Sequence, residues 1–110
     1  MTINVKTQTD ITVVEIAGEL NAGTVPDAQN AVLPLAVPGC KIVLDLTAVP
    51  FMSSAGLRLM LVLFRTVKSK GGKILLAGLA DEIKSTMSLT GFLDFFDCRA
   101  TRAEAVAALT

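Results

Sequence analysis

Residues 41–76 read KIVLDLTAVPFMSSAGLRLMLVLFRTVKSKGGKILL, and this stretch decides the fold of the chain. Residues 41–46 are almost continuously apolar, as in a strand covered on both faces of a parallel sheet. Residues 53–70 carry apolar side chains at helical spacing and stop at the glycine pair 71–72, a typical helix end. Residues 73–76 form a second apolar strand. A strand, a helix and a strand in succession predict two parallel strands joined by a right-handed crossover.

The residues before this unit predict a hairpin and a helix. Two runs rich in β-branched residues, 3–8 and 11–17, flank a short turn and read as antiparallel strands. A loop is expected at residues 18–23. A helix then follows from its N-cap Thr24, and Pro34 ends it because proline cannot continue a helix.

The residues after the unit complete the expected domain. A short helix is predicted over residues 81–89, a linker or short strand over residues 92–98, and a last helix whose cap is Thr101 with Glu104 at the capping-box position. We therefore expect an α/β fold with a mixed, partly parallel sheet of four to five strands. About four helices flank this sheet, and residues 1–110 make one domain.

The composition excludes several classes of function. Ten lysine and arginine residues balance ten aspartate and glutamate residues, and the aromatic residues are five phenylalanines, so nothing indicates direct binding of nucleic acid. Histidine, the commonest general base and metal ligand, is absent. We therefore predict no catalytic residue, no metal and no cofactor. Cys40 and Cys98 read as small buried hydrophobic residues, with a single disulfide left open.

Hydropathy predicts no membrane insertion. The longest run of large apolar residues is the six-residue stretch 59–64, whereas a membrane span needs about 20. The first residues lack the charged start and apolar core of a signal peptide. We expect a soluble cytoplasmic protein.

The helix after residue 53 presents two faces. Its buried face is expected to consist of Leu57, Met60, Leu61, Phe64, Val67 and Lys68. Leu59 and Val62 are apolar on the other side, where Arg58 and Arg65 frame them. Either they are incidental surface residues, or they belong to a surface that binds a partner.

The Ser53-Ser54 pair that opens this helix allows several interpretations. A serine hydroxyl can cap the helix. The amides near Ala55 and Gly56 can face an anion. Nucleophilic catalysis is disfavoured, because no histidine is present to act as the base. Finally, a serine here can accept a phosphoryl group, whose charge the helix N-terminus tolerates. A partner that buries this turn would then be repelled.

Five segments together resemble the STAS domain of the anti-sigma factor antagonist family, and the resemblance covers essentially the whole chain. The segment around Ser54 is the specific one, and the others support it. The segments are GELN at 18–21, IVLDL at 42–46, VPFMSSAGLR at 49–58, GGKILLAG at 71–78 and LTGF at 89–92.

The resemblance implies a regulatory switch rather than an enzyme. In this family the unphosphorylated antagonist sequesters an anti-sigma factor, itself an ATP-dependent serine kinase, and so frees a sigma factor. The kinase phosphorylates a serine at this helix start, and a serine phosphatase resets the protein. The family acceptor aligns with Ser54. Ser53 replaces the family aspartate and becomes a rival acceptor, and Asn21 also stands where the family often has aspartate.

The same resemblance defines a surface for the partner. The residues expected to form it are Asn21, Ser53, Ser54, Ala55, Gly56, Arg58, Leu59 and Val62. Asp45 is the nearest remaining carboxylate, and it either bonds loop amides at its strand end or takes part in the switch. An alternative function is a STAS adaptor subunit of a membrane lipid or anion transport complex, without a phosphorylation switch. A third is an enzyme or nucleotide-binding protein, for which no phosphate loop is present.

Overall fold

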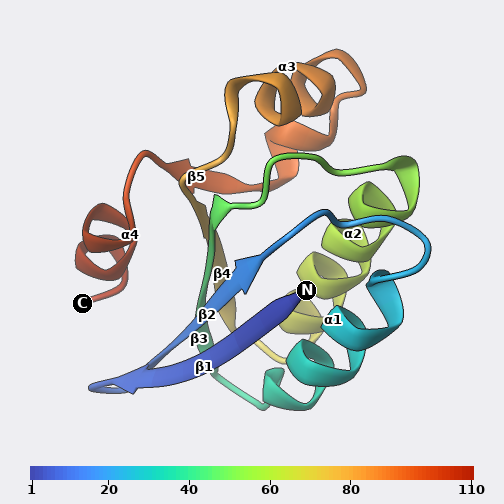
Figure 1. The fold of residues 1–110 in the computed structure, drawn as a ribbon. Coiled ribbons are helices and arrows are strands. Elements are labelled where there is room, and N and C mark those ends of the chain that lie inside the picture. The colour runs from blue at the N-terminus through green and yellow to red at the C-terminus, as the bar shows by residue number, and fades with distance from the viewer.

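A computed structural model describes residues 1–110 and contains one five-stranded sheet flanked by helices (Figure 1). The strands are β1 (Thr2–Gln8), β2 (Ile11–Ala17), β3 (Lys41–Ala48), β4 (Lys73–Ala77) and β5 (Asp97–Arg99). The helices are α1 (Val25–Val32), α2 (Ser54–Ser69), α3 (Asp81–Leu89) and α4 (Arg102–Leu109), with short 3-10 turns at Leu33–Leu35 and Phe92–Phe95.

The strands lie in the sheet in the order in which they occur in the chain, β1-β2-β3-β4-β5. β1 and β2 pair antiparallel as the predicted hairpin, whereas β2, β3, β4 and β5 run parallel to their neighbours. The predicted mixed α/β sheet with about four helices is confirmed. The segment predicted as a linker or short strand contains both a 3-10 turn and the three-residue strand β5.

Both faces of the central strand are covered, which explains why residues 41–46 are almost uniformly apolar. Ile42, Leu44 and Leu46 of β3 belong to the larger core, which also contains the buried side chains of α1 and α2. Val43 points the other way, into a smaller core with Ala105 and Leu109 of α4. One helix therefore covers the second face, on the left in Figure 1, while α1 and α2 cover the first.

The local signals for helix ends are mostly confirmed. Thr101 accepts a hydrogen bond from the Glu104 amide at 3.2 Å, as predicted for a capping residue. Pro34 lies in the 3-10 turn that follows α1. Thr24 is the N-cap of α1, but its hydroxyl does not cap the helix. It donates instead to the Glu19 carbonyl at 2.7 Å, so that Thr24 closes the preceding loop.

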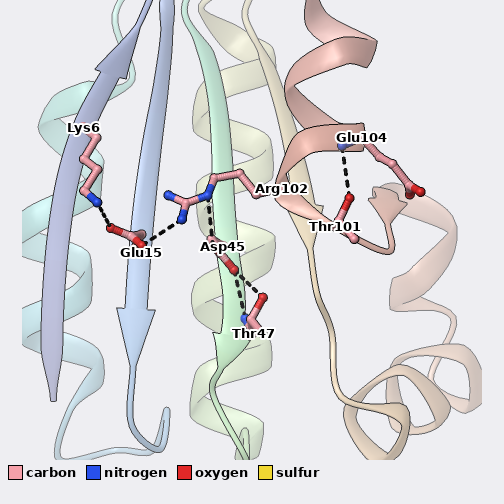
Figure 2. A network of polar contacts seen from close by, with 7 residues as sticks. All are labelled: Lys6, Glu15, Asp45, Thr47, Thr101, Arg102 and Glu104. Atoms are coloured by element: carbon pink, nitrogen blue, oxygen red, sulfur yellow. Dashed lines mark hydrogen bonds and ion pairs between the residues drawn. The ribbon is translucent and has the colours of Figure 1, made fainter.

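A polar network fastens α4 to the sheet (Figure 2). Arg102 Nη2 lies 3.0 Å from Glu15 Oε2, and Arg102 Nε lies 3.5 Å from Asp45 Oδ2. Lys6 Nζ lies 2.9 Å from the other oxygen of Glu15. Asp45 Oδ1 also accepts hydrogen bonds from the amide and the hydroxyl of Thr47.

Asp45 lies within β3, three residues before the strand ends, and its carboxylate faces α4. It alternates with Leu44 and Leu46, which face α2, and its carboxylate contacts Arg102 on the opposite face of the sheet. Of the two interpretations of Asp45, a bond to a nearby amide is observed, that of Thr47. The alternative, a part in the switch, stays a prediction.

This network makes the stability of the fold sensitive to acid. The pKa of the Glu15 carboxyl is lowered, chiefly by the hydrogen bond from Lys6 and further by the charge of Arg102. A lowered pKa in the folded state means that the contribution to stability is present above the ordinary pKa of glutamate. It is lost as the pH falls through the lowered value.

We expect the free energy of unfolding to fall between about pH 5 and about pH 3, and to fall less in the Lys6→Met variant. Urea unfolding followed by circular dichroism at several pH values measures this difference. Asp10 and Asp97 also have lowered pKa values and contribute equally in both proteins. Lys70→Met is the control, since Lys70 forms no ion pair. An equal loss of stability in Lys6→Met and the wild type would contradict the prediction.

Candidate functional site

Two connections lie side by side beyond the carboxyl ends of β2 and β3, and together they form the candidate site (Figure 1). The Leu20 amide donates to the Phe51 carbonyl at 3.0 Å, and the Ser53 amide donates to the Leu20 carbonyl at 2.8 Å. Leu20 and Met52 are both buried where the two segments pair. The loop that contains GELN is thus fixed against the turn that opens α2.

Gly56 allows this close approach. A Cβ atom at position 56 would lie 2.5 Å from Met52 Cγ and 2.9 Å from the backbone oxygen of Leu20. Both distances are shorter than any ordinary contact, and the oxygen belongs to the backbone that holds Ser53. Glycine is required here by packing, not by a left-handed backbone.

Two residues predicted on the partner surface are buried. Gly56 lies beneath the Leu20 loop, and Leu59 is 3% exposed within the larger core. The prediction that Leu59 is exposed is wrong, because Leu59 packs in the same core as Ala28 and Val32 of the neighbouring helix α1. Both residues support the surface from below and do not present a side chain on it.

Ser53 and Ser54 differ in accessibility. Ser54 is exposed and is the first residue of α2. Ser53 is the N-cap residue with an extended backbone, yet its hydroxyl makes no capping bond. The Ser53 Oγ atom is buried and has no hydrogen-bond partner. A modifying enzyme can therefore reach the hydroxyl of Ser54, whereas it would have to displace the loop to reach that of Ser53.

Asn21 shapes the loop beside the two serines. Its Oδ1 atom accepts hydrogen bonds from the Gly23 amide at 2.9 Å and the Thr24 amide at 3.2 Å. Thr24 Oγ1 in turn accepts from the Asn21 amide at 3.0 Å. These are Asx-type bonds, by which asparagine organises a turn. The Asn21 side-chain oxygen is therefore already hydrogen-bonded within the loop.

The start of α2 is electrostatically suited to an anion. The first turn contains no acidic residue, and the N-terminus of this 16-residue helix carries the positive end of the helix dipole. Arg58 is exposed one turn further along, and it has no carboxylate within ion-pair distance. A phosphoryl group on Ser54 would thus meet free amides and a cation.

The exposed apolar residues at this end include one that the sequence did not single out. Phe51 is 50% exposed, and a cavity of about 90 Å³ separates it from Glu82 and Thr86 of α3. The available signal was a large apolar side chain directly after Pro50, in a connection with no helical periodicity. Val62 is 43% exposed on α2, as predicted.

No group of three or more acidic or cysteine side chains gathers where a metal ion could bind. Cys40 and Cys98 are free thiols, each half-buried. None of the helices has both the length and the apolar character that crossing a membrane requires.

The mixed sheet, the paired loops and the serine at the start of α2 agree with the STAS domain expected from the sequence. The sequence model of the STAS domain matches residues 2–105, and the chain belongs to the STAS domain family. Within that family, its relatives are anti-sigma factor antagonists. The anti-sigma-B factor antagonist of Bacillus subtilis is 31% identical over 98 residues, which are 89% of this chain and 90% of the relative. The predicted membership in the anti-sigma factor antagonist family is confirmed.

Solved structures share the fold over nearly the whole chain. An anti-sigma factor antagonist from Mycobacterium paratuberculosis is 29% identical with a TM-score of 0.76, and the match covers 97% of this chain and 92% of that one. The phosphorylated form of the Bacillus cell fate determinant SpoIIAA is 18% identical with a TM-score of 0.75, over 99% of this chain and 100% of that one.

The same fold also occurs as a part of membrane transporters. The murine anion transporter Slc26a9 matches with a TM-score of 0.80 at 15% identity, over 94% of this chain. The match covers only 18% of the transporter chain. At this level of identity the likeness concerns the fold alone.

Proposed function

We propose that this protein is an anti-sigma factor antagonist controlled by phosphorylation of Ser54. In the unphosphorylated state, the surface formed by the loop around Asn21 and the start of α2 binds a cognate anti-sigma factor. Phosphorylation of Ser54 by that anti-sigma factor, acting as a serine kinase, releases it, and a serine phosphatase restores the first state. Residues 1–110 act as a single STAS domain in the cytoplasm.

The exposure of Ser54 is the observation that carries this proposal. Ser54 is exposed on the first turn of α2, while the Ser53 hydroxyl is buried and held below the loop. The family acceptor aligns with the exposed serine of the two. The role of Ser53 is then to end the extended segment through its backbone, since its amide donates to the Leu20 carbonyl.

The effect of the phosphoryl group would be on the surface and not on the fold. It adds about −1.5 to −2 charges at a helix start that has no acidic residue in its first turn. The helix dipole offsets part of that charge within the protein. A partner that covered Phe51, Ser54 and Ala55 would have to bury the rest, and this cost favours release.

The exposed side chains of the proposed surface combine a cation with apolar groups. Arg58 and Val62 are exposed along α2, and Ala55 is half-buried between them and the loop. Phe51 extends the apolar part toward α3. A surface of this kind suits a protein partner and needs no catalytic group, in keeping with a regulatory protein that is not an enzyme.

Mapping of the phosphoacceptor tests this function. Incubation with the cognate kinase and ATP is expected to place one phosphoryl group on the wild type and on Ser53→Ala, and none on Ser54→Ala. Mass spectrometry of the peptide that contains both serines identifies the site. Phosphorylation that survives in Ser54→Ala but disappears in Ser53→Ala would reverse the assignment. Circular dichroism of both variants controls for folding.

A further inference from the structure

A cavity of about 330 Å³ opens at the opposite end of α2 from Ser54. It lies at the edge of the sheet, where β5 is shorter than the strand beside it. β5 pairs only with Leu75–Ala77, so Lys73 and Ile74 of β4 have no strand on their outer side. The C-terminal half of α2 covers the gap from one face and the end of α4 from the other. This volume lies at the lower end of the range for small-molecule sites, roughly 300–1,000 Å³.

Seven of the eleven residues that line this edge cavity are apolar, while polar groups contribute much of its surface. Phe64 of α2 and Phe95 of the 3-10 turn face each other with ring centroids 5.8 Å apart, and Leu109 of α4 lines the other side. Phe95 lines the cavity and is 49% exposed. Phe64 and Phe95 are themselves in contact, so the open volume lies beside this pair.

Two ammonium groups stand at the cavity without a carboxylate partner. Lys68 Nζ lies 5.8 Å from the centroid of the Phe64 ring, and Lys73 lines the cavity from β4. The one acidic residue in the lining, Asp97, is already neutralised. Arg99 donates to both of its oxygens, at 2.7 and 3.1 Å. The cavity therefore combines apolar side chains and polar groups with a net excess of positive charge.

We propose that the edge cavity binds a small amphipathic carboxylate, with an acyl or aromatic body and a single anionic group. The apolar body lies against the Phe64–Phe95 pair and Leu109, and the carboxylate contacts Lys68 and Lys73. A neutral apolar molecule would leave the two ammonium groups unused, and a cation would be repelled by them. The site is distinct from the Ser54 surface, because it involves the last turns of α2 and not its first.

Decanoate is the probe for this proposal, and decanol and decylamine are matched controls with the same chain length. Titration of ¹⁵N-labelled protein, below the concentration at which each probe aggregates, is followed by amide chemical shifts. Decanoate is expected to bind about tenfold more tightly than decanol. Its shifts should concentrate at Phe64, Lys68, Ile74 and Phe95, and leave Ser54 unchanged.

Charge reversal tests which residues hold the carboxylate. Lys68→Glu and Lys73→Glu are each expected to raise the Kd for decanoate about tenfold, whereas the neighbouring Lys70→Glu, outside the cavity, should leave it unchanged. All three side chains are exposed, so the fold should tolerate the variants. Equal binding of decanoate and decanol, an equal loss in Lys70→Glu, or shifts spread over the surface would overturn the proposal.

Discussion

The Ser54→Asp variant is expected to lose nearly all affinity for the cognate anti-sigma factor, while Ser54→Ala binds as the wild type does. A carboxylate at position 54 places a charge, which the helix dipole offsets only in part, in the centre of the proposed interface. Burying such a charge costs about 2–5 kcal/mol, which corresponds to a rise in Kd of at least about thirtyfold. Removal of the hydroxyl costs little, because the Ser54 side chain makes no hydrogen bond within the protein.

The partner is first captured from host lysate on the immobilised Ser54→Ala protein, and its affinity is then measured by calorimetry. Ser69→Asp is the matched control, because it adds the same charge at the exposed other end of α2. It should bind like the wild type. If Ser54→Asp and Ser54→Ala retain the same partner equally, and above all if that partner is a transporter subunit, the phosphorylation switch is refuted. The adaptor function would then replace it.

The second large effect is expected from Gly56→Ala. The added methyl group meets the backbone oxygen of Leu20 at 2.9 Å and must push the GELN loop away from α2. Overpacking of this kind costs about 1–3 kcal/mol of stability, even though alanine is the better helix former by about 1 kcal/mol. The displaced loop also carries Asn21, so affinity for the anti-sigma factor should fall together with stability.

Urea unfolding measures the loss of stability, and calorimetry measures the loss of affinity. Gly23→Ala is the comparison in the same loop, because its Cβ would meet only Asn21 Oδ1, at 3.3 Å, and no backbone atom. This variant should lose less stability than Gly56→Ala does. A Gly56→Ala protein as stable as the wild type would mean that the loop adapts without cost. The close approach of the Leu20 loop to α2 would then not matter for stability or for binding.

The sequence predicted the order of the elements because its local signals agree with the tertiary structure. The continuous apolar run of β3 reflects burial on both faces, and the glycines after α2 mark its end. The reciprocal relation between Thr101 and Glu104 is nearly that of a capping box: the Glu104 carboxylate accepts from the Ala100 amide, one residue before the cap. Such features depend on residues that are close together in the sequence. They can therefore be predicted from one sequence alone.

The details of the site depend on contacts between distant residues, and these were less predictable. Helical periodicity assumes one buried face, but α2 packs against the sheet and against α1, and this second neighbour buries Leu59. Likewise, the pattern Ser53-Ser54 does not reveal which hydroxyl is exposed. That difference arises because the backbone of Ser53 is hydrogen-bonded to Leu20, more than thirty residues earlier.

The sequential order of the strands has a consequence for synthesis on the ribosome. Each new strand joins the sheet beside the strand made just before it, so the domain can assemble progressively while it is being translated. The exception is α4, the last element to emerge. Until Arg102 reaches Glu15 and Asp45, the apolar side chains of Val13, Val43 and Leu75 remain uncovered on one face. Nascent chains that stall before residue 102 should therefore be the species that chaperones bind and proteases remove.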